Sequence, residues 1–471
     1  MEEVQTSVAD SLKYSKKDFS HPKYKLYNIY PLSGSQTLNG VNTGGDEIMF
    51  QLPVKVFNLS KSFINYTFVQ SGLTSVNDTT FYNHKTPLAG IRQIQLYTQY
   101  GVYLCDIYNV NKFLNVAFFA ETSINEFKSN DYENFNAISK YGMYCSTSYA
   151  DGTTITQGNY SQRITTDNTG AIQAPAAGAY AVPQIERQYL DNGVRNAGAP
   201  GSAITVNIQF PMKYIVDSIF SVDKDLYFGE ILQLRIVTDS INNVCFQANY
   251  NDISTNMIAI TRNLNYSNLS FYLAVEQDLN IANQIISKVN TEGLQIAIPY
   301  VYSYKLSLPQ ATNHTISLRF NRAHGKKLRR IYHAPNHTTD ANVYAYCRDN
   351  LGGLNSVSTV YTLLNNERLQ EYNADCTKAQ DYMTLRNKLS GTTYINLDNY
   401  QNNWFWVDDF TTENSLASRE AHDINLSSGI PLDSEQKWDI YMTTANRAFA
   451  HYDFAVTEKE VSIKPGSIIV S

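Results

Sequence analysis

Apolar residues that alternate with polar ones constrain the fold of this chain more than any other feature of its sequence. Between Ile48 and Val56 every second residue is apolar, which predicts a half-buried β-strand with one face on a core. Similar runs follow, and we expect further strands at 63–69, 91–108, 204–210 and 231–237. The pattern favours an all-β protein in which sheets pack face to face.

The strand pattern of the first half returns in the second half, which predicts two tandem copies of one β-domain. In this interpretation the run at 231–237 is the closing strand of the first copy. One large sandwich with accidental similarity is the alternative. The matches are 48–54 with 269–275 at a shift of 221 residues, 204–212 with 424–432 and 232–236 with 452–456 at a shift of 220, and 91–94 with 328–331 at a shift of 237.

The composition indicates a globular protein with large contact surfaces. Charged residues make up 17% of the chain, against about 25% in an ordinary domain, and there are 35 tyrosines. Tyrosine provides a large contact area at a low cost in side-chain entropy, so this composition suits a β-rich protein covered by its neighbours. The net charge of −6 argues against a dedicated nucleic-acid binder.

Cysteine usage and the N-terminal sequence favour maturation in the cytosol or nucleus. The chain has five cysteines, an odd number, and no two of them form a Cys-x-x-Cys pair, so we expect reduced thiols. The first residues lack the apolar core of a signal peptide, and no apolar run approaches the length of a membrane span.

The acidic cluster of Asp223, Asp225 and Glu230 is the first candidate for chemistry. A calcium EF-hand loop counted from Asp223 places Tyr227 and Leu234 where oxygen ligands are required, so that motif is excluded. A glycosidase needs two carboxylates across a cleft, and neighbours on one strand lack the second wall. We interpret the cluster as part of the turn before a strand.

Three histidines and a cysteine invite a metal interpretation: His324, His333, His337 and Cys347. A zinc site needs closely paired ligands on one element, but Pro335 lies between His333 and His337, so no helix presents both rings on one face. We expect surface or interface histidines, and we assign no metal-ligating residue and no cofactor.

The densest basic run holds Lys326, Lys327, Arg329 and Arg330. Such a run contacts phosphates in some proteins and discourages edge-to-edge pairing of strands in others. In an acidic chain we favour a strand edge or a subunit contact, and these four residues form the candidate interaction surface.

Trp404, Phe405 and Trp406 precede Asp408 and Asp409, a combination found on carbohydrate-binding surfaces. Such aromatic residues more often belong to a barrel rim or an oligomer contact. The sequence has no nucleophile elbow, no phosphate-binding loop and no dinucleotide fingerprint, so we assign no catalytic residues.

The order of segments resembles the double jelly-roll major capsid proteins of the adenovirus–tectivirus lineage, nearest to the polinton-like and virophage-like relatives. The resemblance covers most of residues 40–471 and depends on block order. Its blocks are DEIMFQLPVKVFNLSKSFINYTF, LAGIRQIQLYTQYGVYLCDIYNVNKFL, IQFPMKYIVDSIFSVDKDLYFGEILQLRIV, LQIAIPYVYSYKLSL, HGKKLRRIYHA and SGIPLDSEQKWDIYM.

This resemblance implies an all-β fold of two tandem eight-stranded jelly-roll sandwiches, a double jelly roll with long surface loops. We expect an N-terminal arm at 1–40, a first jelly roll at 41–245 and a second at 246–471. A long surface loop would occupy 145–203, which is rich in Gly, Ala, Thr, Asn and Ser.

The resemblance also implies a structural function rather than an enzyme. Three copies would form a trimeric pseudo-hexagonal capsomer that tiles an icosahedral virus shell, with neighbouring capsomers and a penton or minor capsid protein as partners. The protein would belong to the virion capsid, assembled in the host cytoplasm or nucleus. The arm would face inward, where its lysines could meet the genome, an internal membrane or adjoining capsomers; they are Lys13, Lys16, Lys17, Lys23 and Lys25.

Two other classes of function stay open at this point. One is a carbohydrate-binding sandwich or glycosidase that uses Asp408, Asp409 or Asp223, although the missing signal peptide and the odd cysteine count speak against it. The other is a viral attachment or tail-spike subunit, although no fibrous repeat of about 20–50 residues is found.

Overall fold

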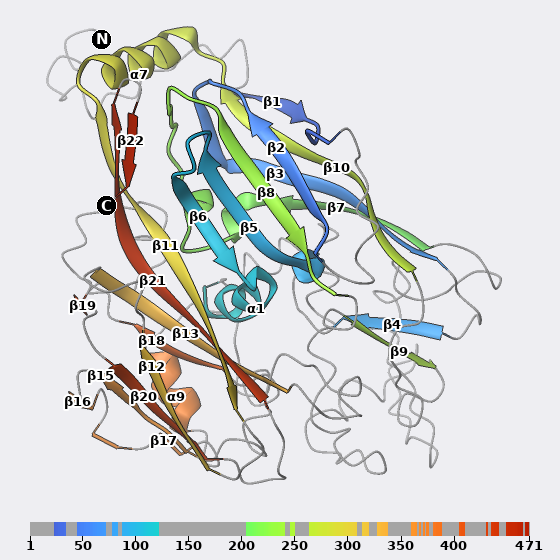
Figure 1. Cartoon of the computed structure of the whole chain (residues 1–471), viewed down its shortest axis with the longest axis vertical. Helices are drawn as coiled ribbons and strands as arrows, with labels where there is room; N and C mark the ends of the chain where they lie inside the picture. Colours follow the sequence, from blue (N-terminus) through green and yellow to red (C-terminus); the bar gives the residue numbers. More distant parts are fainter. Residues whose placement is uncertain are drawn as a thin grey trace, which may run out of the picture.

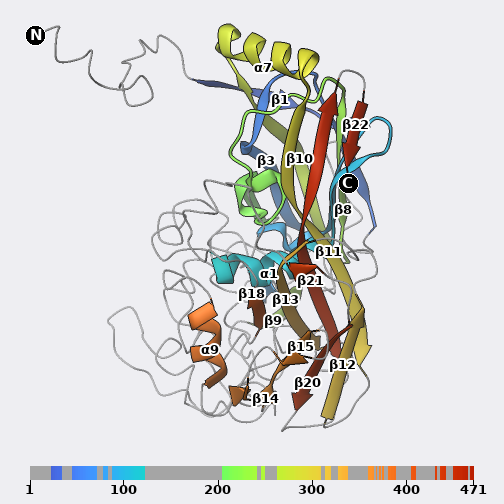
Figure 2. The same ribbon diagram turned by 90° about the vertical axis from the view of Figure 1, so that its left-hand side faces the viewer.

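The computed structural model is an assembly of antiparallel sheets with few helices (Figures 1 and 2). The predicted loop at 145–203 lies outside the described residues. The structure describes residues 23–33, 45–71, 78–82, 87–121, 204–240, 245–249, 263–308, 313–319, 327–337, 359–364, 367–368, 371–372, 374–375, 380–388, 405–409, 430–431, 435–441, 449–464 and 467–470.

The first half forms a sandwich of two four-stranded sheets in which all neighbours are antiparallel. A small separate pair joins β4 (Asp78–Tyr82) to β9 (Cys245–Asn249). One sheet has the order β1 (Tyr24–Ile29), β10 (Asn263–Glu276), β3 (Phe57–Ser71) and β7 (Ile204–Pro211), and the other has the order β2 (Glu47–Leu52), β8 (Leu232–Thr238), β5 (Ile91–Thr98) and β6 (Tyr103–Tyr108).

The second half forms another sandwich. Its first sheet has the order β11 (Leu294–Leu308), β21 (Phe449–Lys464), β13 (Lys327–His337) and β18 (Trp406–Asp409), with β19 (Ile430–Pro431) on β13 and β22 (Ser467–Val470) on β21. Its second sheet has the order β12 (Asn313–Arg319), β20 (Glu435–Tyr441), β15 (Thr362–Leu364) and β16 (Glu367–Arg368). A small pair joins β14 (Thr359–Val360) to β17 (Ala374–Asp375).

The two sandwiches have the same topology, strand for strand. In each, the chain places its first, third, sixth and eighth main strands in one sheet and the others in the facing sheet. In each, the eighth strand (β10 or β21) enters between the first and the third. The predicted fold of two tandem eight-stranded sandwiches is therefore confirmed.

The residue shifts that suggested the duplication are wrong, although the duplication itself is present. They align β2 with β10, yet these strands face each other across one core, where the rings of Phe50 and Phe271 lie 6.2 Å apart. Matching by topology instead pairs β2 with β12, β8 with β20 and β10 with β21. Alternation is common to every half-buried strand, so a shift can align it without aligning equivalent strands.

The predicted domain limits also need correction, because they took the strand at 231–237 as the closing strand of the first copy. Strand β10 pairs with β1 and β3, so a boundary at 245–246 would remove the closing strand from the first sandwich. The division falls after Glu276, and β8 is the penultimate strand rather than the last. Residues 24–29 of the expected arm form β1 and belong to the first sheet.

Helix α7 (Leu279–Thr291) joins the two sandwiches and lies across one end of the molecule (Figures 1 and 2). The carboxylate of Asp278 caps it by accepting from the backbone N–H of Asn280 at 2.9 Å. Gly293 follows the helix at a φ of 77°, a conformation that costs glycine little. No helix among the described residues is long and apolar enough to cross a bilayer.

Helix α1 (Val110–Glu121) connects the core of the first sandwich to the second (Figure 1). The fully buried ring of Phe113 packs edge-on against Tyr332 of β13 at 5.6 Å and lies 5.2 Å from Phe454 of β21. The Tyr332 hydroxyl donates to Asp217 of the first sandwich at 2.7 Å. Consequently the β13–β21 sheet is buried on both faces, one on its own core and one on the first sandwich.

Replacing Phe113 by alanine is expected to lower the free energy of unfolding by about 3–5 kcal/mol, because it leaves a cavity between the two sandwiches. Urea denaturation followed by tryptophan fluorescence measures this loss. Phe113→Leu is the matched control and should cost much less. A loss below about 1 kcal/mol for Phe113→Ala would contradict a tightly packed interface.

Candidate functional site

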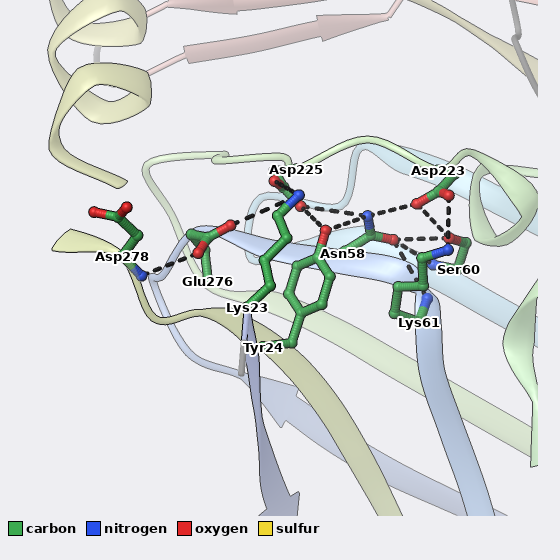
Figure 3. A network of polar contacts seen from close by, with 9 residues as sticks. All are labelled: Lys23, Tyr24, Asn58, Ser60, Lys61, Asp223, Asp225, Glu276 and Asp278. Carbon is green, nitrogen blue, oxygen red and sulfur yellow. Dashed lines mark hydrogen bonds and ion pairs between the residues drawn. The ribbon is translucent and has the colours of Figure 1, made fainter. Parts of the chain in front are cut away.

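The acidic cluster of the sequence is part of a polar network that holds the N-terminal strand in place (Figure 3). One oxygen of Asp223 accepts hydrogen bonds from Asn58 at 2.9 Å and Ser60 at 3.1 Å, and the other lies 2.7 Å from the ammonium of Lys61. These three partners all belong to β3. Asp223 therefore fixes the loop before β8 to the sheet beneath it.

Asp225 makes the connection to β1. It accepts from the hydroxyl of Tyr24 at 2.8 Å and lies 3.2 Å from the ammonium of Lys23, which is also 3.9 Å from Glu276 at the end of β10 (Figure 3). Lys23 was expected to be available to the genome or a membrane. It instead contacts two carboxylates of its own chain, which corrects that expectation for this residue.

The electrostatics of the network explain why it is a poor acid–base site. Burial alone would raise the pKa of Asp223, but the hydrogen bonds from Lys61 and Asn58 and the charge of Lys61 hold it below its ordinary value. Burial raises the pKa of Glu230, which lies outside the network. Asp223 and Asp225 are thus engaged by cations, an amide and hydroxyl groups rather than paired across a cleft.

Asp223→Asn should reduce stability at neutral pH by less than about 1 kcal/mol, because the side chain of Asp223 is 43% exposed. A carboxyl whose folded pKa is depressed stabilises the fold above its unfolded pKa and loses this effect as pH falls through the folded pKa. The difference between wild type and variant should therefore close in acid.

Melting temperatures measured from pH 7 to pH 2 test this expectation. Glu371→Gln, an exposed acid outside the network, serves as the control and should show no such closing difference. A wild-type advantage that persists below the folded pKa would contradict an ionic origin.

The predicted basic surface is only partly described. Lys326 lies outside the described residues, and Lys327, Arg329 and Arg330 lie on β13. Arg330 donates to Asp409 at 2.9 Å and approaches Asp217 of the first sandwich to 4.0 Å. Arg330 therefore belongs to the contact between the sandwiches, while an external role for the other residues stays a prediction.

The aromatic segment does not form a sugar-stacking platform in its described part. Phe405 and Trp406 are buried, and the indole N–H of Trp406 donates to Asp408 at 3.1 Å. Asp408 also accepts from Thr362 of the facing sheet at 2.8 Å, which places this carboxylate inside the second sandwich. A glycosidase built on Asp408 would have no open cleft at this carboxylate.

A second polar network lies in the interior of the second sandwich and was missed by the sequence reasoning. His333 contacts Asp453 through Nδ1, and its Nε2 lies 3.3 Å from Asp408. His451 Nε2 lies 2.9 Å from the same oxygen of Asp453. All four side chains are buried, so the expectation of a surface or interface histidine is wrong for His333.

Burial and hydrogen bonding act in opposite directions in this network. Burial would lower the pKa of His333, but its contacts with Asp408 and Asp453 raise it above the ordinary value. Burial would likewise raise the pKa of Asp453, but the neighbouring charge of His451 and the contact with His333 lower it. The side chain of His337 is not described, and His324 and Cys347 lie outside the described residues.

Similarity to known proteins is found in the fold and not in the sequence. No family model matches this chain, and no curated protein matches it by sequence. Among solved structures, the PBCV-1 virus capsid subunit is similar over 98% of this chain and 99% of its own, with a TM-score of 0.52 at 11% identity.

Two further structures agree over nearly the whole chain. The Faustovirus major capsid protein has a TM-score of 0.56 at 8% identity, covering 98% of this chain and 94% of its own. A chain of the Sputnik virophage structure has a TM-score of 0.52 at 10% identity, covering 98% and 91%. This chain has the double jelly-roll fold. Each sandwich described above is one jelly roll, with β1 to β10 in the first and β11 to β21 in the second.

Proposed function

We propose that this protein is a viral major capsid protein, a structural subunit rather than an enzyme. The observation that carries the proposal is the double jelly roll shared, over nearly the full chain, with capsid proteins of the PBCV-1, Faustovirus and Sputnik structures. The low charge content and the 35 tyrosines also suit a subunit whose faces are covered by neighbours.

The contact between the two jelly rolls suggests how copies associate. The contact joins two different surfaces: α1 of the first jelly roll lies on the outer face of β13 and β21 in the second. The anchor on that face is Tyr332, which lies directly opposite Phe454 in the strand register. A contact between two different faces generates a ring when its rotation closes.

Both faces of this contact have counterparts elsewhere on the chain. Helix α9 (Gln380–Lys388) follows the fourth and fifth main strands of the second jelly roll, as α1 does in the first. On the first jelly roll, Phe63 of β3 lies opposite Tyr272 of β10, and their rings stack at 4.7 Å. These strands are the topological equivalents of β13 and β21.

Repetition of the internal contact would therefore dock α9 of one copy on the Phe63–Tyr272 face of the next. Met383 of α9 is 56% exposed, and both aromatic rings are half-buried. Three chains joined in this way close a ring of six jelly rolls, a trimer with pseudo-hexagonal outline. Such capsomers tile an icosahedral shell.

The proposal includes further partners. Neighbouring capsomers and a penton or minor capsid protein would complete the shell. The N-terminal residues before Lys23 would contact the genome, an internal membrane or adjoining capsomers. The protein would be located in the virion capsid after assembly in the host cytoplasm or nucleus.

Native mass spectrometry of the purified chain should give a species of three times 53.2 kDa. Met383→Glu is expected to weaken association by about 2 kcal/mol or more, because it places a charge in the centre of the contact. Tyr272→Arg tests the opposite face. Each variant should yield folded monomers with the circular dichroism of wild type.

Leu279→Glu is the matched control for an added charge. Leu279 is 74% exposed in the first turn of α7, where a carboxylate is favourable to the helix dipole. This variant should form trimers. A wild-type chain that stays monomeric would overturn the proposed function, whereas intact trimers of both interface variants would overturn only the proposed faces.

Deletion of residues 2–22 should leave trimers intact and impair assembly into shells, because these residues precede the Lys23–Asp225 contact and β1. Deletion of residues 2–29 removes β1 and should lower the melting temperature as well. Electron microscopy of assembly reactions and thermal unfolding separate the two effects. Normal shells from the shorter deletion would contradict a role of the arm in assembly.

A further inference from the structure

The buried histidine–aspartate network of the second jelly roll has the arrangement of a metal site. In the register of β13 and β21, His333 lies opposite Asp453, and His451 is two residues from Asp453 on the same face of β21. One donor atom from each of these three side chains lies within 4.8 Å of the others. We propose that His333, His451 and Asp453 bind a divalent transition-metal ion, with zinc as the expected ion.

The surroundings of the three side chains resemble the outer shell of a protein metal site. A metal-bound imidazole usually donates its second ring N–H to a carboxylate, which fixes the tautomer and the ring orientation. With His333 Nδ1 directed at the site, its Nε2 lies 3.3 Å from Asp408. Asp408 is itself fixed by Trp406 at 3.1 Å and Thr362 at 2.8 Å.

The charge of the network also favours a divalent cation. Asp408 and Asp453 are buried, and a buried carboxylate requires a compensating positive charge. A divalent ion supplies both charges while both imidazoles stay neutral, as metal ligation requires. Within the described part of the chain, the second oxygen of Asp453 is buried and accepts no hydrogen bond, so this carboxylate retains a lone pair for a ligand.

The donor set identifies the class of ion. Two imidazole nitrogens and one carboxylate oxygen suit zinc and its transition-metal neighbours, whereas calcium and magnesium take oxygen ligands. The second oxygen of Asp453 or a water molecule would complete the coordination. The ion would connect β13 to β21 inside the core, so its function would be structural and independent of subunit association.

The first experiment is elemental analysis of the full-length protein purified without chelator, then dialysed against chelator and titrated with zinc sulfate. We expect about one zinc ion per chain and a melting temperature that falls on chelation and recovers with zinc. Protein that takes up no zinc and shows no change in melting temperature would overturn the proposal.

Variants locate the ion. His451→Gln and Asp453→Asn should abolish stoichiometric binding, and Asp408→Asn should weaken it about 10- to 100-fold because it disturbs the orientation of His333. Asp409→Asn is the matched control, since Asp409 neighbours Asp408 on β18 but pairs with Arg330 on the opposite face. Its zinc affinity should equal that of wild type.

Zinc binding by His451→Gln with wild-type affinity would also overturn the proposal, because it would place the ion elsewhere. Trimer formation is measured separately by native mass. A chain that forms trimers but takes up no zinc would therefore refute the metal site alone, and a chain that binds zinc but stays monomeric would refute the proposed association alone.

Discussion

The pairing of each jelly roll's last strand between its first and third strands is the contact on which the rest of the structure depends. Strand β10 joins β1 to β3, and β21 joins β11 to β13. In both cases the partners are separated by long stretches of sequence, so the sheet exists only after the chain has returned. The aromatic pairs Phe63–Tyr272 and Tyr332–Phe454 lie on strands joined by these pairings, and so do His333, His451 and Asp453.

Period-two alternation was sufficient to predict individual strands but not their partners. It identified β2, β3, β7 and β8, and it marked 91–108, which the structure divides into β5 and β6 at a turn where Gly101 has a φ of 83°. It could not say that β10 closes the first sandwich, because strand order depends on pairing between distant segments. The topological repeat became visible only when both sheets were compared strand by strand.

The candidate sites show the same limit. The spacing of ligands excluded an EF-hand around Asp223, but it could not show the partners of Asp223 on β3, which lie more than 160 residues away. A comparison of His333 only with ligands nearby in the sequence missed Asp453, which is 120 residues distant. One local signal was available: His451 and Asp453 are two polar residues on the same face of a strand that is otherwise mainly apolar.

The position of α1 has a consequence for synthesis of the chain. All main strands of the first jelly roll are complete at Glu276, before the second begins at Leu294, so the first unit can fold while the ribosome still makes the second. During that interval Phe113 lacks its partners Tyr332 and Phe454. A nascent chain arrested between these points therefore exposes an aromatic surface that chaperones recognise, and limited proteolysis of ribosome-bound chains would reveal it around α1.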